Sequence, residues 1–291
     1  MLIYTTRAKR IGMSKFASIG NAADVEFIEL LDYFSKDPKS SVIAVYVEGV
    51  EHGRALYQSL KLASSKKPVV VLKGGKSEAG SRATLSHTGS MAGSPQLFDG
   101  IIKQAGCVSA PTFDSFLEIC KLFDYQPLPQ GRNIGIISNT GGAAVLATDA
   151  ASALGLEIPT LDESTMKEMK QAMSPMASVE NPVDVVASGG RREYKVATKL
   201  ILEDNNVDML LVICGVPTFA GMTQTEHAAG TLEGIRTANN NKPVVGVWLS
   251  GDVGKPGKDL LEMNRIPCYD DPSLAALCME RVASYSLYEQ R

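Results

Sequence analysis

Hydrophobic and polar positions form two kinds of pattern along this chain. Continuous apolar runs predict strands at residues 41–47, 68–72, 133–138, 209–214 and 243–248. The strands at 68–72 and 209–214 are expected to be buried. Between these runs, apolar residues recur at helical spacing. Phe27, Leu31 and Phe34 form one such stripe, and Asp24 is the expected N-cap of its helix. The glycine-rich residues 251–257, which follow the last run, are expected to form an exit loop.

Strands and helices alternate from end to end, and this order predicts an α/β fold with doubly wound parallel sheets. Residues 125–132 contain two prolines and a glycine and indicate a linker, after which the pattern starts again. We therefore expect two flavodoxin-like, three-layer parallel-sheet domains, at residues 1–130 and 131–291. Ligands of such sheets bind at the carboxyl ends of the strands.

The most unusual stretch, residues 73–94, joins a predicted strand to a helix with Ser94 as N-cap and Pro95 in the first position. It spans about twenty residues, whereas such connections usually have about two to six. It holds five glycines, three basic residues and His87. Glycines let backbone N–H groups converge on an anion, and a neutral imidazole there is a possible phosphate acceptor. A surface loop with an incidental histidine is the alternative.

Two further groups follow predicted strands. Glu48 comes after the strand at 41–47, so we expect it to share a site with the loop of His87. A solvated loop carboxylate is the alternative for this residue. A second turn joins a strand to an alanine-rich helix, and such a turn points backbone N–H groups at an anion. It consists of Asn139, Thr140, Gly141 and Gly142, and a tightly packed turn of small residues explains it equally well.

Composition narrows the class of protein. The 291 residues carry a formal net charge of −3, which argues against nucleic acid or an anionic membrane as the main partner. No apolar stretch is long enough to span a bilayer, and the N-terminus lacks the features of a signal peptide. The five cysteines show no C-x-x-C spacing and are expected to be reduced core residues of a cytoplasmic protein. The three histidines are far apart, so no metal site is expected.

Several motifs together carry a resemblance. Ser86-His-Thr-Gly-Ser-Met-Ala-Gly93 follows a Val-Val-Val-Leu-Lys-Gly strand, and further motifs occur at residues 14–24, 45–49, 136–142 and 181–184. In this order they resemble the nucleoside-diphosphate-forming acyl-CoA synthetases, which are relatives of succinyl-CoA synthetase. The resemblance covers most of the chain, and five motifs in register are more specific than any one of them. The family converts acyl-CoA, ADP or GDP, and phosphate into a carboxylic acid, CoA and a nucleoside triphosphate.

The resemblance implies roles for individual residues. His87 is then the residue that carries phosphate, and Glu48 is the carboxylate that holds and polarises its imidazole. The resemblance also implies two groups of phosphate-binding residues. The first lies beside the histidine and consists of Ser86, Thr88 and Gly89. The second is the turn Asn139, Thr140, Gly141 and Gly142, whose helix is one of the two that bind the phosphate with their N-termini. The role of Asp184 stays open.

The same resemblance implies partners. A CoA-binding Rossmann domain and an ATP-grasp domain complete the family's enzymes, and we recognise neither in this sequence. We therefore expect no tightly bound cofactor, with CoA, ADP or ATP, and Mg²⁺ handled as substrates together with a partner in an oligomer. Whether the chain is a truncated piece, a split subunit or a degenerate relative is open, as is the acyl substrate. A regulatory module, like those fused to protein acetyltransferases, and a generic anion-binding protein are the alternatives.

Overall fold

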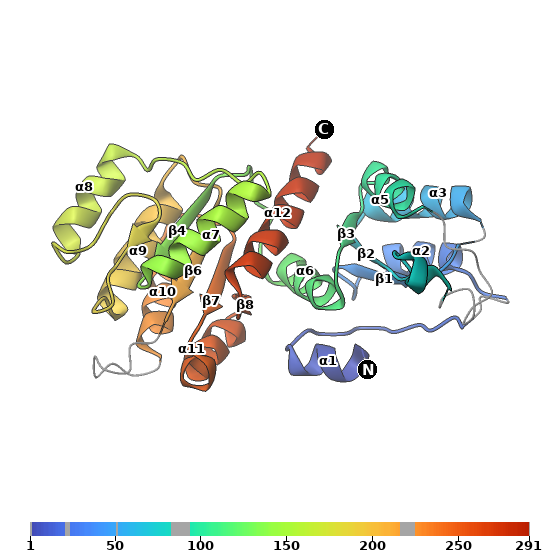
Figure 1. Ribbon diagram of the computed structural model, residues 1–291, viewed down its shortest axis with the longest axis horizontal. Coiled ribbons are helices and arrows are strands. Elements are labelled where there is room, and N and C mark those ends of the chain that lie inside the picture. Colours follow the sequence, from blue (N-terminus) through green and yellow to red (C-terminus); the bar gives the residue numbers. More distant parts are fainter. Residues whose placement is uncertain (1, 21–23, 51, 83–93, 216–224, 291) are drawn as a thin grey trace. The chain divides into compact units, whose positions relative to one another are not determined.

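The computed structural model describes residues 2–20, 24–50, 52–82, 94–215 and 225–290 (Figure 1). The chain forms two compact units. Unit 1 is Met1–Asp124 together with Leu287–Arg291, and unit 2 is Tyr125–Ser286. The last five residues therefore group with unit 1, although the sequence placed them in the second domain. Each unit contains a parallel sheet with helices between its strands, which confirms the predicted α/β class.

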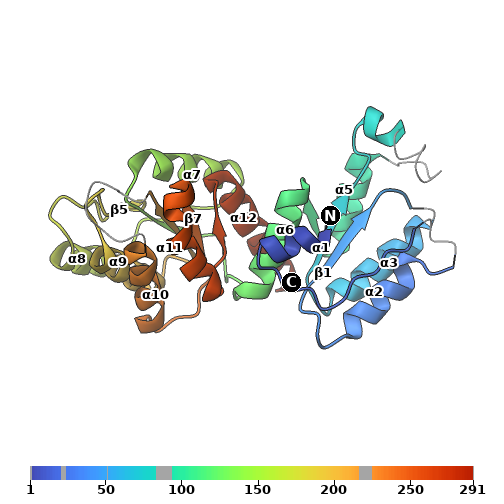
Figure 2. The ribbon, with the colours of Figure 1, turned by 90° about the horizontal axis from the view of Figure 1, so that it is seen from below.

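Unit 1 contains a three-stranded parallel sheet in the order β1-β2-β3, with β1 at Ile43–Val47, β2 at Val69–Lys73 and β3 at Val108–Ala110. Its helices are α1 (Leu2–Ala8), α2 (Phe27–Lys36), α3 (Gly53–Ser64), α5 (Pro95–Gln104) and α6 (Phe113–Tyr125). Helices α2 and α3 lie side by side (Figure 2). Apolar side chains of α2, α3 and α5 form one core with those of β1 and β2.

The two faces of β1 differ. Ile43, Val45 and Val47 are buried in this core, whereas Ala44 and Tyr46 are exposed. Side chains alternate along a strand, so Glu48, two residues beyond Tyr46, continues the exposed row. Val47 pairs in register with Lys73, the last residue of β2. The chain segments that follow both strands therefore start at the same carboxyl edge of the sheet.

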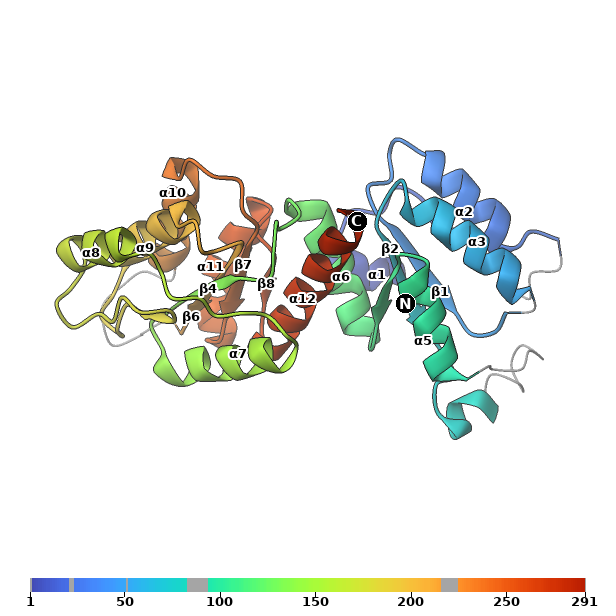
Figure 3. The same ribbon diagram turned by 90° about the horizontal axis from the view of Figure 1, so that it is seen from above.

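Unit 2 contains a five-stranded parallel sheet in the order β5-β4-β6-β7-β8, which is the flavodoxin-like order 2-1-3-4-5. The strands are β4 (Ile134–Ser138), β5 (Val183–Asp184), β6 (Met209–Cys214), β7 (Val244–Trp248) and β8 (Cys268–Tyr269). Helices α7 (Gly141–Ala153) and α12 (Pro272–Glu289) lie on one face of the sheet (Figure 3). The other face carries α9 (Arg191–Glu203), α10 (Glu226–Thr237) and α11 (Gly251–Met263), and α8 is Glu163–Ala172.

Local capping chemistry explains where two helices of unit 1 begin. The expected N-cap of α5 is confirmed, because the Ser94 hydroxyl accepts a hydrogen bond from the Leu97 N–H at 3.5 Å. The expected N-cap of α2 is wrong. Glu26 takes this place instead of Asp24, and its N–H donates to the Glu29 carboxylate at 3.0 Å. A carboxylate three residues into the helix satisfies the cap backbone, so α2 starts two residues later than Asp24 would set it.

The glycine-rich exit loop expected at residues 251–257 is also wrong, since these residues form the first turns of α11. Gly254 is buried, and a Cβ there would lie 3.4 Å from Trp248 Cδ1. Close packing on the sheet therefore outweighs the low helix propensity of the glycines and of Pro256. Within the described ranges, no helix is both long and apolar enough to cross a membrane.

Candidate functional site

The turn after β4 lies at the topological switch point of the unit 2 sheet. From β4 the chain continues to β5 on one side, and it then crosses to β6 on the other side. At such a point, the loops that follow two neighbouring strands turn to opposite faces of the sheet. A crevice forms between these loops at the carboxyl edge. Residues 139–142 come directly after β4 and therefore occupy the place where α/β sheets bind ligands.

Asn139 joins the exits of the neighbouring strands β4 and β6. Its side-chain amide donates to the Gly215 carbonyl at 2.8 Å, and its Oδ1 accepts the Gly215 N–H at 2.9 Å. Gly215 directly follows β6. The Thr140 hydroxyl donates to Asn139 Oδ1 at 3.2 Å, and a Cβ on Gly215 would lie 2.8 Å from that hydroxyl oxygen. A side chain at position 215 would therefore push Thr140 out of this arrangement.

The start of α7 is held from within the turn. The Ser138 hydroxyl accepts the Thr140 N–H at 3.0 Å and donates to the Thr140 carbonyl at 2.9 Å. That carbonyl also accepts the N–H groups of Ala143 and Ala144. The N–H groups of Gly141 and Gly142 open the first turn, where a helix provides no acceptor for them, and both glycines are exposed. Such a helix start attracts an anion.

Asp184 lies beside this helix start, an arrangement that the sequence left open. It ends β5, the edge strand that pairs with β4. Its Oδ1 accepts the Val186 N–H at 2.8 Å, and its Oδ2 would be 3.9 Å from a Cβ on Gly141. The available signal was the Asn-Pro-Val-Asp motif itself, but only the pairing of β5 with β4 brings the carboxylate to α7.

In unit 1, Glu48 is held at the carboxyl edge of β1. Its Oε1 accepts a hydrogen bond from the Tyr46 hydroxyl at 3.0 Å. The Lys73 ammonium donates to the Glu48 carbonyl at 2.5 Å and also to the Gly74 carbonyl. Burial lowers the pKa of Lys73, although the Glu48 charge opposes this. The arrangement orients a half-buried carboxylate at this edge of the sheet.

The remaining predicted site residues, Ser86, His87, Thr88 and Gly89, lie outside the described residues. The stretch that leads to them is described as far as residue 82, and it differs from the continuous loop that we expected. Residues 78–82 are helical, and the Ser77 hydroxyl accepts the Gly80 N–H at 3.0 Å near the start of this segment. Among the described residues, no three His, Cys, Asp or Glu side chains come together as metal ligands.

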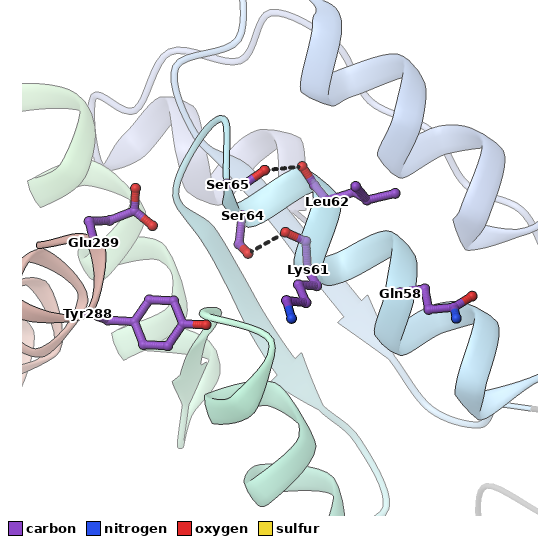
Figure 4. A pocket seen from close by; sticks show the side chains of 7 residues that line it. All are labelled: Gln58, Lys61, Leu62, Ser64, Ser65, Tyr288 and Glu289. Atoms are coloured by element: carbon purple, nitrogen blue, oxygen red, sulfur yellow. Dashed lines mark hydrogen bonds between the residues drawn. The ribbon is translucent and has the colours of Figure 1, made fainter. Parts of the chain in front are cut away.

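Unit 1 also contains a pocket of about 460 Å³ (Figure 4). Its lining comes from the last turns of α3 and from the C-terminus: Gln58, Lys61, Leu62, Ser64, Ser65, Tyr288 and Glu289. Glu48 precedes α3, whereas the pocket lies at the opposite end of that helix. Helices that connect parallel strands run back to the amino edge of the sheet, so the pocket is not part of the carboxyl-edge site.

Two family models match the chain. Residues 1–123 match the succinyl-CoA ligase like flavodoxin domain, and residues 134–274 match the Ligase-CoA domain. The matches correspond to the two units of the structure and leave the segment between 123 and 134 unassigned.

Individual relatives agree with these models. The chain is 44% identical to the alpha subunit of ADP-forming acetate–CoA ligase II of Pyrococcus furiosus, over 99% of this chain and 62% of that protein. It is 33% identical to the alpha subunit of ligase I of the same organism, over 98% of this chain and 61% of that protein. A solved acetyl-coenzyme A synthetase 1 of Ca. Korarchaeum cryptofilum, in complex with phosphate and ADP, superposes with a TM-score of 0.92. It is 32% identical, and the match covers 99% of this chain and 62% of that one. The chain thus spans less than two thirds of the length of these relatives.

Proposed function

Because the chain belongs to the family of ADP-forming acyl-CoA ligases, we propose that it forms the part of such an enzyme that carries phosphate on His87. The complete enzyme interconverts acyl-CoA, ADP and phosphate with a carboxylic acid, CoA and ATP. In the forward direction, phosphate displaces CoA to give an acyl phosphate. An imidazole nitrogen of His87 then attacks phosphorus and the carboxylate leaves. Finally, an oxygen of ADP takes the phosphoryl group and frees the imidazole.

The start of α7 is the observation that carries this proposal. It offers the N–H groups of Gly141 and Gly142 at the switch point of a parallel sheet, and the Asn139–Gly215 pair holds the strand exits in place. Phosphate needs such donors while it moves between groups. In unit 1, Glu48 supplies the carboxylate that orients the imidazole and stabilises its charge. Ser86, Thr88 and Gly89 flank the histidine and add donors.

The proposal includes partners. An ATP-grasp domain or subunit binds the nucleotide with Mg²⁺, and a CoA-binding Rossmann domain binds CoA, so the working enzyme is an oligomer or a larger assembly. The nucleotide, Mg²⁺ and CoA are handled as substrates and are not resident cofactors of this chain. We also propose a cytoplasmic location, because all five cysteines are buried free thiols, as is usual in a reducing compartment.

Phosphoryl transfer to His87 tests the proposal. The chain is mixed with γ-labelled ATP, Mg²⁺ and an ATP-grasp partner that is active with another member of the family. We expect acid-labile, base-stable label on the chain, and no label on His87→Ala. An unlabelled wild-type chain would refute the proposal and favour a regulatory module.

The anion site at α7 has its own test. Nothing lies within 4 Å of a Cβ on Gly142, so longer side chains fit there. Gly142→Glu places a negative charge at the helix start, whereas Gly142→Gln has the same shape without the charge. We expect Gly142→Glu to raise the KM for phosphate roughly tenfold and Gly142→Gln to change it little. Equal effects of the two variants would remove this site from the mechanism.

A further inference from the structure

The exposed face of β1 carries a second residue that acts on the Glu48 site. Tyr46 and Glu48 are two residues apart, so the strand directs both side chains to the same side. The tyrosine hydroxyl lies 3.0 Å from Glu48 Oε1. A phenol that donates to a carboxylate makes a charge-assisted hydrogen bond, which is stronger and more directional than a neutral one.

We propose that Tyr46 is a positioning residue for the Glu48 carboxylate, which it holds in the orientation that the phosphohistidine step uses. The inference rests on the proposed function, because Glu48 acts there as the partner of the imidazole. In this role Tyr46 acts on the reaction through the Glu48 carboxylate, to which its hydroxyl donates.

The backbone of Glu48 is fixed separately, so Tyr46 controls only the side chain. The Lys73 ammonium binds the Glu48 carbonyl and, through the Gly74 carbonyl, ties it to the exit of β2. The Gly74 N–H donates to the Val47 carbonyl at 2.9 Å. With these contacts holding the main chain, the side-chain torsions of Glu48 are what remains to be set.

Gly74 makes room for the tyrosine hydroxyl. A Cβ at this position would lie 2.9 Å from the Tyr46 hydroxyl oxygen and 3.3 Å from Glu48 Cγ. The close approach of the segments that follow β1 and β2 therefore leaves room for the Tyr46–Glu48 contact. Burial, together with the hydrogen bond to Glu48, raises the pKa of Tyr46. A tyrosine hydroxyl keeps its proton at neutral pH in any case, so it remains a donor.

The decisive experiment measures phosphoryl transfer to His87 in Tyr46→Phe, with the same active partner. This variant removes one oxygen and keeps the ring. We expect kcat to fall roughly tenfold, the size expected for one charge-assisted hydrogen bond, while the KM for ATP stays unchanged. Combined with Glu48→Gln, it should cause no further loss, because the group that it positions is already gone. Gly74→Ala should reproduce the defect by displacing the hydroxyl.

Tyr33→Phe is the matched control. Tyr33 is 53% exposed and Tyr46 is 52% exposed, both lie in unit 1, and Tyr33 lies on α2, away from Glu48. It should transfer phosphate at the wild-type rate. A Tyr46→Phe variant with wild-type kcat, or one that lowers the rate equally in the Glu48→Gln background, would overturn the inference. A wild-type chain that takes no label would instead overturn the proposed function.

Discussion

The crossing of α9 and α10 allows a sharp test of packing in unit 2. Gly230, in the middle of α10, faces the first residue of α9. A Cβ at Gly230 would lie 2.2 Å from the Arg191 carbonyl oxygen and 2.9 Å from its carbonyl carbon. This obstacle is main chain and cannot rotate away. The perturbation is Gly230→Ala, one of the smallest changes that fills this contact.

Two opposing effects set its magnitude. Carbon and oxygen atoms approach to about 3.3 Å at closest, so α10 must move away from α9 by about 1 Å. Overpacking of this kind costs about 1–3 kcal/mol. Alanine in a helix interior recovers about 0.5–1 kcal/mol relative to glycine. With the middle of each range, the net expectation is a loss of about 1.3 kcal/mol, or roughly 3–5 °C in Tm for a unit of this size.

The chain contains one tryptophan, Trp248, which is buried in unit 2, so its fluorescence reports the unfolding of that unit. Gly142→Ala is the matched control, because it makes the same chemical change in a helix of the same unit, with nothing within 4 Å of the new Cβ. It should leave Tm unchanged or slightly raised. A Gly230→Ala variant as stable as Gly142→Ala would show that α10 moves away at no cost, and the reasoning from the close contact would be refuted.

Three further predictions concern buried polar groups. Burial lowers the pKa of His227, whose Nε2 bonds the Gly189 carbonyl, although that bond and Glu226 oppose the shift. The unfolded chain then binds a proton that the folded chain resists, so stability should be full above about pH 6.5 and fall below it. His227→Gln should flatten this acid slope in Trp248 fluorescence, while His52→Gln, at an exposed site, should not. Tyr194→Phe removes a buried hydrogen bond to the Ile213 carbonyl at 2.7 Å, and chemical denaturation should show a loss of about 1–2 kcal/mol; an unchanged midpoint would contradict this. Burial raises the pKa of the thiols of Cys107, Cys120 and Cys214 to about 12. A thiol reagent at about pH 8 should therefore modify these three cysteines only after unfolding. Fast labelling of the native chain would contradict this prediction.

The fold was predictable from the sequence where burial is complete. The runs that became β2, β4, β6 and β7 are buried at every position, so their apolar character alone identifies them. Prediction failed where tertiary contacts outweigh local preference. Gly254 and Pro256 argue for a loop, yet packing against Trp248 makes α11 begin at Gly251. No local pattern contains that contact, because it joins a helix to the preceding strand.

In the candidate site, the sequence indicated the turn after β4 but not the contacts that support it. Asn139 and the glycines after it follow a clear strand and precede a clear helix, so an anion-binding turn could be inferred. Gly215, which holds the Asn139 side chain by two hydrogen bonds, is 76 residues away from it in the sequence. The two residues become neighbours only because β4 pairs with β6. Asp184 reaches α7 through a two-residue strand, which is too short to give a sequence signal. Partners across strands depend on sheet order, which a single sequence leaves open.

The groups at the start of α7 suit a phosphate that is being transferred better than a tightly bound ligand. Residues 138–153 contain no lysine or arginine, so this segment offers backbone N–H groups and hydroxyls and no full positive charge. A helix start acts as roughly half an elementary charge, and Asp184 beside it reduces the attraction further. Fixed dipoles need no rearrangement when charge develops on an anion. A site of this kind stabilises phosphate during transfer and still releases it, as the proposed mechanism requires.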